Sequence, residues 1–558
     1  MQLNKLQINR LEKILKQARG AGVLSWAEKL NKKNPKAEIY LVGGAVRDAL
    51  MARETKDYDF VVRNVSAKNL QNFLAHSGTV DLVGKNFGVF KFIPKELKAK
   101  GYEALDIALP RTEHSIHLSG ERHDFKIQSN SRLKIEEDLS RRDFTVNAMA
   151  IKLEYWSTKT LEHNQIKLID GFGGLEDLKN KTIRTVGKPE DRFKEDYSRM
   201  LRAIRFACQL NFEIEQKTKK AIKKLIKYLN KVETRHGMSL QKGAKEYIIP
   251  REIIAKEFLK ALVENPARAF DLFDELGVFK ILFPEILKMK GCVQPKNYHS
   301  EGDVWVHTRL CLEMLDSKLF ADRFKNNITL PAGTGRDLSL PRKKPYDSEV
   351  ALGILLHDIE KPSTAAWIKK GGKKKLQFYN HDAKGGDTAK KICERLKLSA
   401  PEKVGVDAEN VAWMIKKHML LIEGRIDKIR ASKLEKYFLS MRYPGENLLK
   451  LAFIDAIATI PQGKKIPRTK KDLKNWLSLK GFEIAIARIK QIKSISTDKK
   501  KAPDVLLNGN EIMKILKLKP GKKVGKILGE LREAQLLKKV KTKKEAESFI
   551  KNLVTGNR

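Results

Sequence analysis

The chain changes its apolar pattern once, and this change constrains the fold more than any other feature. Between Glu38 and about residue 160 the apolar residues fall in short runs: IYLVGG, YDFVV, VDLVG, FGVFKFI and ALDIAL. Runs of this length, bounded by turn residues, predict β-strands. After Gly174 this pattern disappears, and segments such as RMLRAIRFACQL (199–210) have apolar residues at helical spacing. The sequence therefore predicts an α/β or α+β unit followed by a mostly α-helical remainder.

The length of 558 residues is too great for one hydrophobic core, so we expect three to five units. Residues 1–35 have apolar positions at helical spacing and predict an N-terminal helical extension. The other units are predicted at residues 36–160, 161–290, 291–460 and 461–558. Within the fourth unit, residues 326–349 are polar and rich in glycine and proline, which predicts an exposed loop.

Several classes of protein are disfavoured by composition. No run of about 18 apolar residues is present, so no membrane span and no membrane partner are expected. The N-terminal residues MQLNKLQINRLEKILKQ lack the continuous apolar stretch of a signal peptide. Four scattered cysteines without CxxC spacing predict neither a disulfide framework nor a cysteine zinc site. We therefore expect a cytoplasmic protein, with no obligate protein partner evident.

The charge balance points to a polyanionic partner. The chain has 112 Lys and Arg against 68 Asp and Glu, a formal net charge of +44. Such an excess favours nucleic acid through counterion release. Residues 461–558 alone contain 27 basic and 9 acidic residues, which is about two-fifths of the net charge. This concentration predicts a nucleic-acid-binding C-terminal segment; a generally lysine-rich composition is the alternative.

The stretch LVGGAVRDALMARETKDYDFVV combines glycines with two nearby aspartates. Asp57 and Asp59 are two residues apart, so a strand would direct both carboxylates to one side. Mg²⁺ prefers oxygen ligands and often uses one or two carboxylates together with substrate phosphates. Because Gly43, Gly44 and Arg47 lie just upstream, the pattern suits a metal–triphosphate site. The alternative is an exposed strand edge with solvated aspartates.

GGAVRD followed by KDYDF resembles the head domain of the class II tRNA nucleotidyltransferase and bacterial poly(A) polymerase family, in the polymerase-β-like superfamily. EEDLSRRDFTVNAMAI, LIDGFGGLEDL and RFKEDYSRMLRAIRFACQLNFEI are similar to later motifs of this family, in the same order. One departure is Gly171, where the family usually has proline. The motifs cover residues 38 to about 290. The resemblance implies a polymerase-β-like nucleotidyltransferase head followed by helical neck, body and tail domains.

The resemblance also implies roles for individual residues. Asp57 and Asp59 would hold Mg²⁺ while the 3′-hydroxyl of an RNA attacks the α-phosphate of a nucleoside triphosphate and pyrophosphate leaves. Asp106 lies where the superfamily can place a third catalytic carboxylate, although members of this family often lack it. The residues implied to bind the triphosphate and ribose are Gly43, Gly44, Arg47, Arg142, Asp143 and Asn147.

A separate pair is expected to choose the nucleotide. Asp196 and Arg199 are three residues apart, so on one helix they would share a face and offer an acceptor and a donor. A local surface ion pair is the alternative on the residues alone. The resemblance implies a protein template that selects CTP or ATP, with Arg202 in support.

A second set of candidate ligands lies in the C-terminal half. His357-Asp358 follows an apolar helical run and resembles the HD superfamily of metal-dependent phosphohydrolases; His123-Asp124 is expected to be only a loop. Separate helices can direct such groups to one centre, and imidazole with carboxylate suits Ni²⁺, Mn²⁺, Fe or Zn²⁺. The alternative is a degenerate HD fold kept as an RNA-binding or structural body. The six expected ligands are His307, His357, Asp358, His381, His418 and Asp455.

These expectations give a first hypothesis of CCA addition to tRNA from CTP and ATP, with possible HD-domain hydrolysis at RNA 3′ ends. VGKNFGVFKF and the segment from LLNGNEIMK to AESFI resemble the CCA-adding branch, and this tail is expected to bind tRNA. The alternatives that stay open are a poly(A) polymerase, an A-adding or CC-adding relative, and a non-catalytic RNA-binding scaffold.

Overall fold

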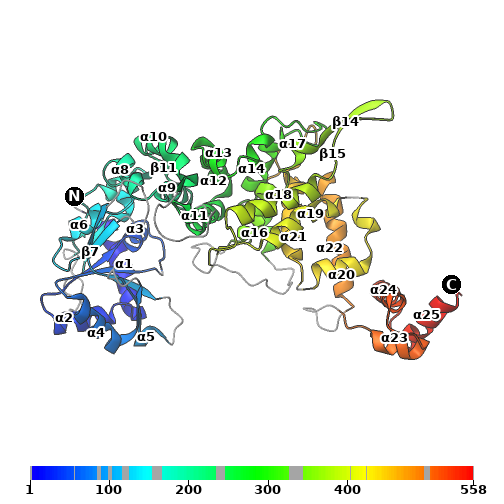
Figure 1. Cartoon of the computed structure of the whole chain (residues 1–558), viewed down its shortest axis with the longest axis horizontal. Helices are drawn as coiled ribbons and strands as arrows, with labels where there is room; N and C mark the ends of the chain where they lie inside the picture. The colour runs from blue at the N-terminus through cyan, green and yellow to red at the C-terminus, as the bar shows by residue number, and fades with distance from the viewer. Residues whose placement is uncertain are drawn as a thin grey trace. The chain divides into compact units, whose positions relative to one another are not determined.

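The computed structural model describes residues 3–55, 57–83, 89–98, 104–115, 125–153, 166–233, 246–325, 344–402, 404–422, 424–440, 442–495 and 503–556 (Figure 1). The chain divides into two compact units. The first consists mainly of Met1–Glu264 and Leu272–Leu282, and the second mainly of Asn265–Asp271, residues 283–325 and Lys344–Arg558. Residues 84–88 of VGKNFGVFKF, His123-Asp124 and residues 326–343 of the expected loop lie outside the described residues.

A seven-stranded sheet forms the centre of the first unit, in the order β3-β4-β5-β2-β1-β8-β9. β2 and β5 are parallel, and every other neighbouring pair is antiparallel. All five apolar runs predicted as strands are confirmed, as β1 to β5. The strands are β1 (Glu38–Val42), β2 (Asp59–Arg63), β3 (Gly78–Val83), β4 (Val89–Pro94), β5 (Leu105–Ala108), β8 (Ala150–Lys152) and β9 (Leu168–Ile169), with the separate pair β6 (Arg111–Ser115) and β7 (Phe125–Ser129).

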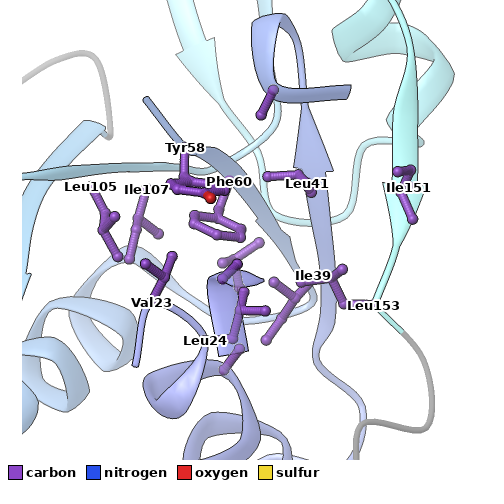
Figure 2. Close-up of a cluster of buried hydrophobic side chains, with 14 of the residues drawn as sticks. Val23, Leu24, Ile39, Leu41, Tyr58, Phe60, Leu105, Ile107, Ile151 and Leu153 are labelled. Carbon is purple, nitrogen blue, oxygen red and sulfur yellow. The ribbon is translucent and has the colours of Figure 1, made fainter. Parts of the chain in front are cut away.

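The two faces of this sheet have different coverings. Alternate residues of a strand point to opposite faces, and in β1 Ile39 and Leu41 join one apolar cluster while Tyr40 and Val42 join another. The first cluster also contains buried residues of α1 (Lys5–Ala21) and α2 (Ser25–Lys33). Figure 2 shows part of this cluster, including Val23 and Leu24 from the connection between the two helices. The N-terminal helices therefore complete the core of the head.

Trp26 is the largest side chain that α2 contributes to this core. It is 1% exposed, and its ring packs edge-on against Phe60 of β2 at 5.3 Å and Phe92 of β4 at 6.3 Å between ring centroids. Aromatic pairs in this geometry stabilise a core beyond the area they bury. One indole therefore ties the N-terminal helices to two strands.

Helices make up most of the remaining described chain up to residue 282, where the helix at residues 266–275 is divided between the two units. The helix predicted at residues 199–210 is confirmed as α9 (Arg199–Leu210), which has nine buried residues. The other helices up to residue 282 are α3 (Gly44–Leu50), α4 (Ala67–Ser77), α5 (Lys95–Lys98), α6 (Ile135–Ser140), α7 (Gly174–Lys179), α8 (Pro189–Glu195), α10 (Gln216–Leu225), α11 (Arg251–Glu264), α12 (Pro266–Glu275) and α13 (Val278–Leu282). Within the described part of this segment, the accompanying strands are two residues long: β10 (Thr182–Ile183), β11 (Glu213–Ile214), β12 (Val232–Glu233) and β13 (Glu246–Tyr247).

As far as the structure describes the second unit, it is helical apart from one hairpin. The expectation that the strand pattern ends before residue 174 is wrong, because β14 (Ala365–Lys370) and β15 (Lys373–Phe378) form an antiparallel hairpin. Its turn consists of Gly371 and Gly372, both with positive φ, 59° and 75°, which glycine adopts without strain. The helices are α14 (Val304–Met314), α15 (Lys318–Phe324), α16 (Ser348–Leu356), α17 (Lys361–Thr364), α18 (His381–Arg395), α19 (Ala408–Lys417), α20 (Ala431–Phe438), α21 (Gly445–Ala458), α22 (Lys480–Lys493), α23 (Gly509–Leu516), α24 (Lys522–Leu536) and α25 (Lys543–Thr555).

The last three helices have an apolar cluster of their own, in which Ile512, Ile527 and Ile550 are buried. Among the described residues, no helix has the length and apolar content needed to cross a membrane.

Replacing Trp26 with alanine tests the packing of the N-terminal helices. We expect Trp26→Ala to lower the free energy of unfolding of the first unit by about 3–5 kcal/mol, because a buried aromatic ring is removed from the core. Urea unfolding followed by far-UV circular dichroism measures this. The matched control is Trp367→Ala, since Trp367 is 66% exposed. Equal stability of the two variants would contradict the packing described.

Candidate active sites

Three aspartates lie on the face of the head sheet opposite α1 and α2. Asp59 begins β2 and is in register with Asp106 on the parallel neighbour β5. Their strand neighbours Phe60 and Ile107 point into the helix-covered core, so the two aspartates point to the other face. Asp57 precedes β2 by two residues and lies near enough to Asp59 to raise its pKa. The structure thus brings together the two predicted magnesium ligands and the third carboxylate.

The pKa of Asp59 is raised to about 7. Burial is the largest cause, and the charges of Asp57 and Asp106 add to it, whereas Arg142 and Lys91 oppose it. Lys91 Nζ lies 2.5 Å from Asp106 Oδ1. Burial together with two neighbouring carboxylates disfavours the charged form of Asp59. Clustered carboxylate oxygens fit a divalent cation such as Mg²⁺.

Gly43 forms the turn between β1 and α3 with φ of 72°. A Cβ atom at this position would lie 2.8 Å from Arg142 Nη1 and 3.5 Å from Asp59 Oδ2. The missing side chain therefore allows the Arg142 guanidinium to lie beside the carboxylate cluster. Asp138 is fully buried and accepts a hydrogen bond from Arg142 Nη2 at 3.4 Å, which holds this arginine in place. The same carboxylate also accepts a hydrogen bond from Arg141 Nη2 at 2.7 Å.

The remaining predicted head residues form a buried polar network. Arg47 Nη1 donates to Asn147 Oδ1 at 2.7 Å, and Asn147 Nδ2 donates to Asp143 Oδ1 at 3.4 Å. Arg202 Nε then donates to Asp143 Oδ2 at 2.8 Å. Burial alone would raise the pKa of Asp143, but the Arg202 charge lowers it to about 2. The network links the glycine turn to α9. Arg47 also donates to the carboxylate of Asp48 at 2.8 and 3.0 Å.

The expectation that Asp196 and Arg199 lie on one face of one helix is wrong. α8 ends at Glu195, Asp196 has extended backbone angles, and α9 begins at Arg199. Asp196 Oδ1 accepts a hydrogen bond from the backbone of Ser198 at 2.9 Å, while Arg199 pairs with Glu195. Both predicted residues are nearly buried, with 8% and 9% exposure. A turn between two helices therefore positions them.

Some residues of this site were not predicted from the sequence. The ring of Phe206 lies beneath three guanidinium groups, 4.0 Å from Arg205, 5.4 Å from Arg47 and 5.5 Å from Arg202. Glu257 on α11 offsets the charge of Arg205, since its Oε2 lies 2.6 Å from Arg205 Nε. The i, i+4 spacing of Arg202 and Phe206 on α9 is a local signal that could have indicated the contact. No local signal marks Glu257, because it comes from a distant helix.

The six predicted ligands of the second unit are brought together in two groups. His307 Nε2 lies 3.1 Å from Asp455 Oδ1, and His357 Nε2 lies 3.8 Å from the same oxygen. In the other group His381 Nε2 lies 3.3 Å from His418 Nε2 and 3.6 Å from Asp358 Oδ1. Asp358 joins the groups, since its Oδ2 lies 3.2 Å from His357 Nε2. Within each group the candidate ligand atoms lie within 4.8 Å of one another.

The four imidazoles all direct Nε2 toward this centre. Each Nδ1 is within hydrogen-bond distance of an acceptor, at 2.6–2.8 Å: the carbonyl oxygens of Ile354, Phe378 and Ile415 for His357, His381 and His418, and Glu301 Oε1 for His307. When Nδ1–H donates, Nε2 carries a lone pair.

The histidines of this centre differ in charge: burial opposes protonation of His307, but Cys311, Asp455 and Glu301 raise its pKa well above the usual value. Burial and the neighbouring His381 and His357 lower the pKa of His418 to about 4, which keeps its ring neutral. The Nε2 atoms of His381 and His418 then face each other at 3.3 Å, an arrangement that a bound cation would stabilise. The residues present thus fit a transition metal held by imidazole and carboxylate.

Two charged residues of this centre were missed from the sequence. Lys361 Nζ lies 2.7 Å from Asp358 Oδ2 and donates to Gln294 Oε1 at 2.8 Å. Glu301 accepts from the Ile460 backbone at 2.9 Å as well as from His307. The position of Lys361 three residues after Asp358 was a usable signal. Glu301 could be recognised only once the fold placed it beside His307.

Known families match three parts of the chain. Residues 39–184 match the poly A polymerase head domain, residues 335–460 the HD domain, and residues 468–549 a putative tRNA nucleotidyltransferase domain 2. The first match implies dependence on a divalent metal ion.

Whole-chain relatives agree with these matches. A multifunctional CCA protein of Neisseria meningitidis serogroup A is 31% identical over 385 residues, which cover 69% of this chain and 74% of the relative. An A-adding tRNA nucleotidyltransferase of Deinococcus radiodurans is 26% identical over 513 residues, 91% of this chain and 94% of the relative.

A Bacillus stearothermophilus CCA-adding enzyme in complex with CTP shares the fold, with a TM-score of 0.55 and 19% identity over 96% of this chain and 97% of that one. The polymerase-β-like head and the helical remainder expected from the motifs are confirmed. The chain therefore belongs to the tRNA nucleotidyltransferase and poly(A) polymerase family, together with the multifunctional CCA proteins, and carries an HD domain.

Proposed function

We propose that the protein adds CCA to the 3′ end of tRNA, without a nucleic-acid template, from CTP and ATP. The observation that carries the proposal is the aspartate cluster beside the Gly43 turn, where Asp59 has a pKa of about 7. Clustered carboxylates next to a guanidinium suit a metal–triphosphate substrate. The multifunctional CCA protein of Neisseria meningitidis supports the choice of tRNA as acceptor.

In this proposal Asp57 and Asp59 hold Mg²⁺, and Asp106 on the neighbouring strand is the third catalytic carboxylate. When bound, Mg²⁺ lowers the pKa of the RNA 3′-hydroxyl and offsets charge on the leaving pyrophosphate. The turn at Gly43 and Gly44 leaves space for the triphosphate, and Arg142 neutralises it. Arg47, Asn147 and Asp143 hold the turn and contact the ribose and phosphates through the buried network described above.

Nucleotide choice is assigned to Asp196 and Arg199. Their carboxylate and guanidinium supply the acceptor and the donor that the Watson–Crick edges of cytosine and adenine require. Asp196 lies between α8 and α9 whereas Arg199 is the first residue of α9, and these separate positions support independent adjustment of the two side chains. Arg202 supports the pair from α9 by anchoring Asp143.

Addition of A alone is a second candidate activity. The Deinococcus radiodurans relative, named an A-adding enzyme, covers 91% of this chain, against 69% for the Neisseria meningitidis multifunctional CCA protein. The catalytic residues proposed above serve either activity, since both transfer a nucleotide to an RNA 3′-hydroxyl.

The HD centre is proposed to be a transition-metal phosphohydrolase acting on RNA 3′ ends. Its ligands are His307, His357, Asp358, His381, His418 and Asp455, with Ni²⁺, Mn²⁺, Fe or Zn²⁺ as the metal. Lys361, buried beside Asp358, supplies a positive charge for a substrate phosphate. Removing a terminal phosphate would leave the hydroxyl that the head extends.

Each proposed function is assigned to a range of residues. We assign the head to residues 36–160, the neck to 161–290, the HD domain to 291–460 and the tRNA-binding tail to 461–558; the helices within 1–35 support the head core. The family matches at 39–184, 335–460 and 468–549 support this assignment. Free cysteines at all four positions support a reducing, cytoplasmic location.

One incubation tests the proposed activity. With Mg²⁺ and a tRNA lacking its 3′ CCA, we expect two C additions from CTP followed by one A from ATP. Gel electrophoresis and sequencing of the products measure this. Addition of A only to tRNA ending in CC would establish the second candidate, and long A tails on any RNA would indicate a poly(A) polymerase.

The metal assignment is tested by Asp59→Asn, which keeps the shape of the side chain and removes its charge. We expect transfer to fall about a thousandfold or more, because loss of a metal ligand removes several kcal/mol of transition-state stabilisation. Single-turnover rates with CTP measure it, while filter binding of tRNA stays unchanged. The matched control is Asp81→Asn on β3, an exposed carboxylate of the same sheet. A near-normal rate for Asp59→Asn would refute the assignment.

The HD assignment is tested by His357→Ala. We expect the purified variant to lose at least half of the transition metal bound by the parent protein, because His357 Nε2 faces both Asp358 and Asp455. Elemental analysis after dialysis measures the stoichiometry. His76→Ala, at an exposed histidine of α4, is the control. Nucleotide addition by the head should be unaffected, and equal metal content in the variant and the parent would exclude the site.

A further inference from the structure

The β14–β15 hairpin is joined to the HD centre at its base. His381, three residues after the end of the hairpin, lies with Nδ1 2.8 Å from the carbonyl oxygen of Phe378, the last residue of β15. The Phe378 ring lies 5.5 Å from Lys361 Nζ and 6.4 Å from the His381 ring. The base of the hairpin therefore lies beside the proposed metal ligands of the HD centre.

The outer half of the hairpin is strongly basic. From Ala365 to Phe378 the sequence is AAWIKKGGKKKLQF, with five lysines and no acidic residue. Lys369 lies directly opposite Lys374 in the strand register, and both are exposed. Like charges directly opposite one another destabilise a strand pair. An anionic ligand across this pair would remove the repulsion.

An exposed aromatic ring lies next to this charged pair. Trp367 is 66% exposed and opposite Leu376 in the register. Because alternate residues share a face, Trp367 lies on the same face of the ribbon as Lys369 and Lys374. The partner of Trp367, Leu376, lies two residues before the last residue of β15. At ~3.4 Å per residue, this places Trp367 about 7 Å along the ribbon from the base of the hairpin. An aromatic platform beside cations is the arrangement that binds single-stranded nucleic acid, by stacking a base and neutralising the backbone.

We propose that the β14–β15 hairpin binds the single-stranded 3′ end of an RNA and directs it to the HD centre. Trp367 stacks on a base, and Lys369 and Lys374 contact the phosphates on either side. This inference rests on the proposed function of the HD centre as a phosphohydrolase of RNA ends. Base stacking favours RNA over an acidic protein or an anionic membrane, which offer charge but no bases.

The test compares a small and a long substrate of the HD centre in the full-length protein. One is a mononucleotide 2′,3′-cyclic phosphate, and the other is a single-stranded oligonucleotide ending in the same group. For Trp367→Ala and for Lys369→Ala/Lys374→Ala we expect KM for the oligonucleotide to rise about tenfold, as for loss of one stacked base or two phosphate contacts. The kcat values and the rate on the mononucleotide should stay at parent level.

Salt dependence gives an independent readout. In the double lysine variant the plot of log affinity against log salt concentration should become less steep. The magnitude of its negative slope should decrease by about 1.4, since each lost phosphate contact on a single strand contributes about 0.7. The matched control is Lys318→Ala/Lys391→Ala, which removes the same charge from exposed positions on α15 and α18. Unchanged KM in both hairpin variants, or an equal change in the control, would overturn the proposal.

A failure of the proposed function is distinguishable from a failure of the hairpin. If the parent protein hydrolyses neither substrate, the phosphohydrolase proposal fails, and the hairpin is judged by binding alone. An oligonucleotide with 4-thiouridine near its 3′ end should then crosslink to the peptide containing Trp367, and fluorescence anisotropy should show weaker binding by both variants. Crosslinks confined to other segments, or weaker binding of anionic vesicles with unchanged RNA affinity, would overturn the inference.

Discussion

The pairing of β2 with β5 is the constraint on which the head site depends. This pairing places Asp59 opposite Asp106, and the period of two directs both away from the core that contains Phe60 and Ile107. A slip of one residue would move the carboxylates under α1 and α2 and expose apolar side chains. Trp26, packed against two strands, stabilises the correct register from the opposite face. The same strand register therefore determines both the hydrophobic core on one face of the sheet and the aspartate site on the other.

The head site and the HD centre differ in the groups that they offer to a metal ion: carboxylates in the head, and mainly imidazoles in the HD centre. In the head, burial and the neighbouring carboxylates raise the pKa of Asp59 to about 7, and Arg142 beside them is placed to balance an incoming triphosphate. In the HD centre, backbone carbonyls and Glu301 lie at hydrogen-bond distance from the Nδ1 atoms and orient the imidazoles so that their Nε2 atoms face inward. Carboxylate clusters suit Mg²⁺, and imidazole clusters suit transition metals. The proposed functions follow from these donor sets.

Sequence patterns predicted what depends on local periodicity. The five strands, the helix at residues 199–210 and the grouping of six HD ligands needed only spacing and motif order. Asp196 and Arg199 were placed on one helix because their spacing fits a helical turn; the chain instead breaks between α8 and α9. The β14–β15 hairpin was missed because lysine and glycine dominate it, and neither is typical of strands. Glu257, Glu301 and Phe206 matter through contacts that only the tertiary fold creates.

The central claim is that Asp57 and Asp59 hold the divalent cation that binds the nucleotide. Anomalous X-ray scattering from crystals soaked with Mn²⁺ and CTP tests it most directly. We expect an anomalous peak within coordination distance, about 2.0–2.2 Å, of Asp59 and Asp57 oxygens, with the triphosphate beside Gly43. This peak should be lost in crystals of the Asp59→Asn variant. A triphosphate-bound peak away from both aspartates would show that they do not hold the cation.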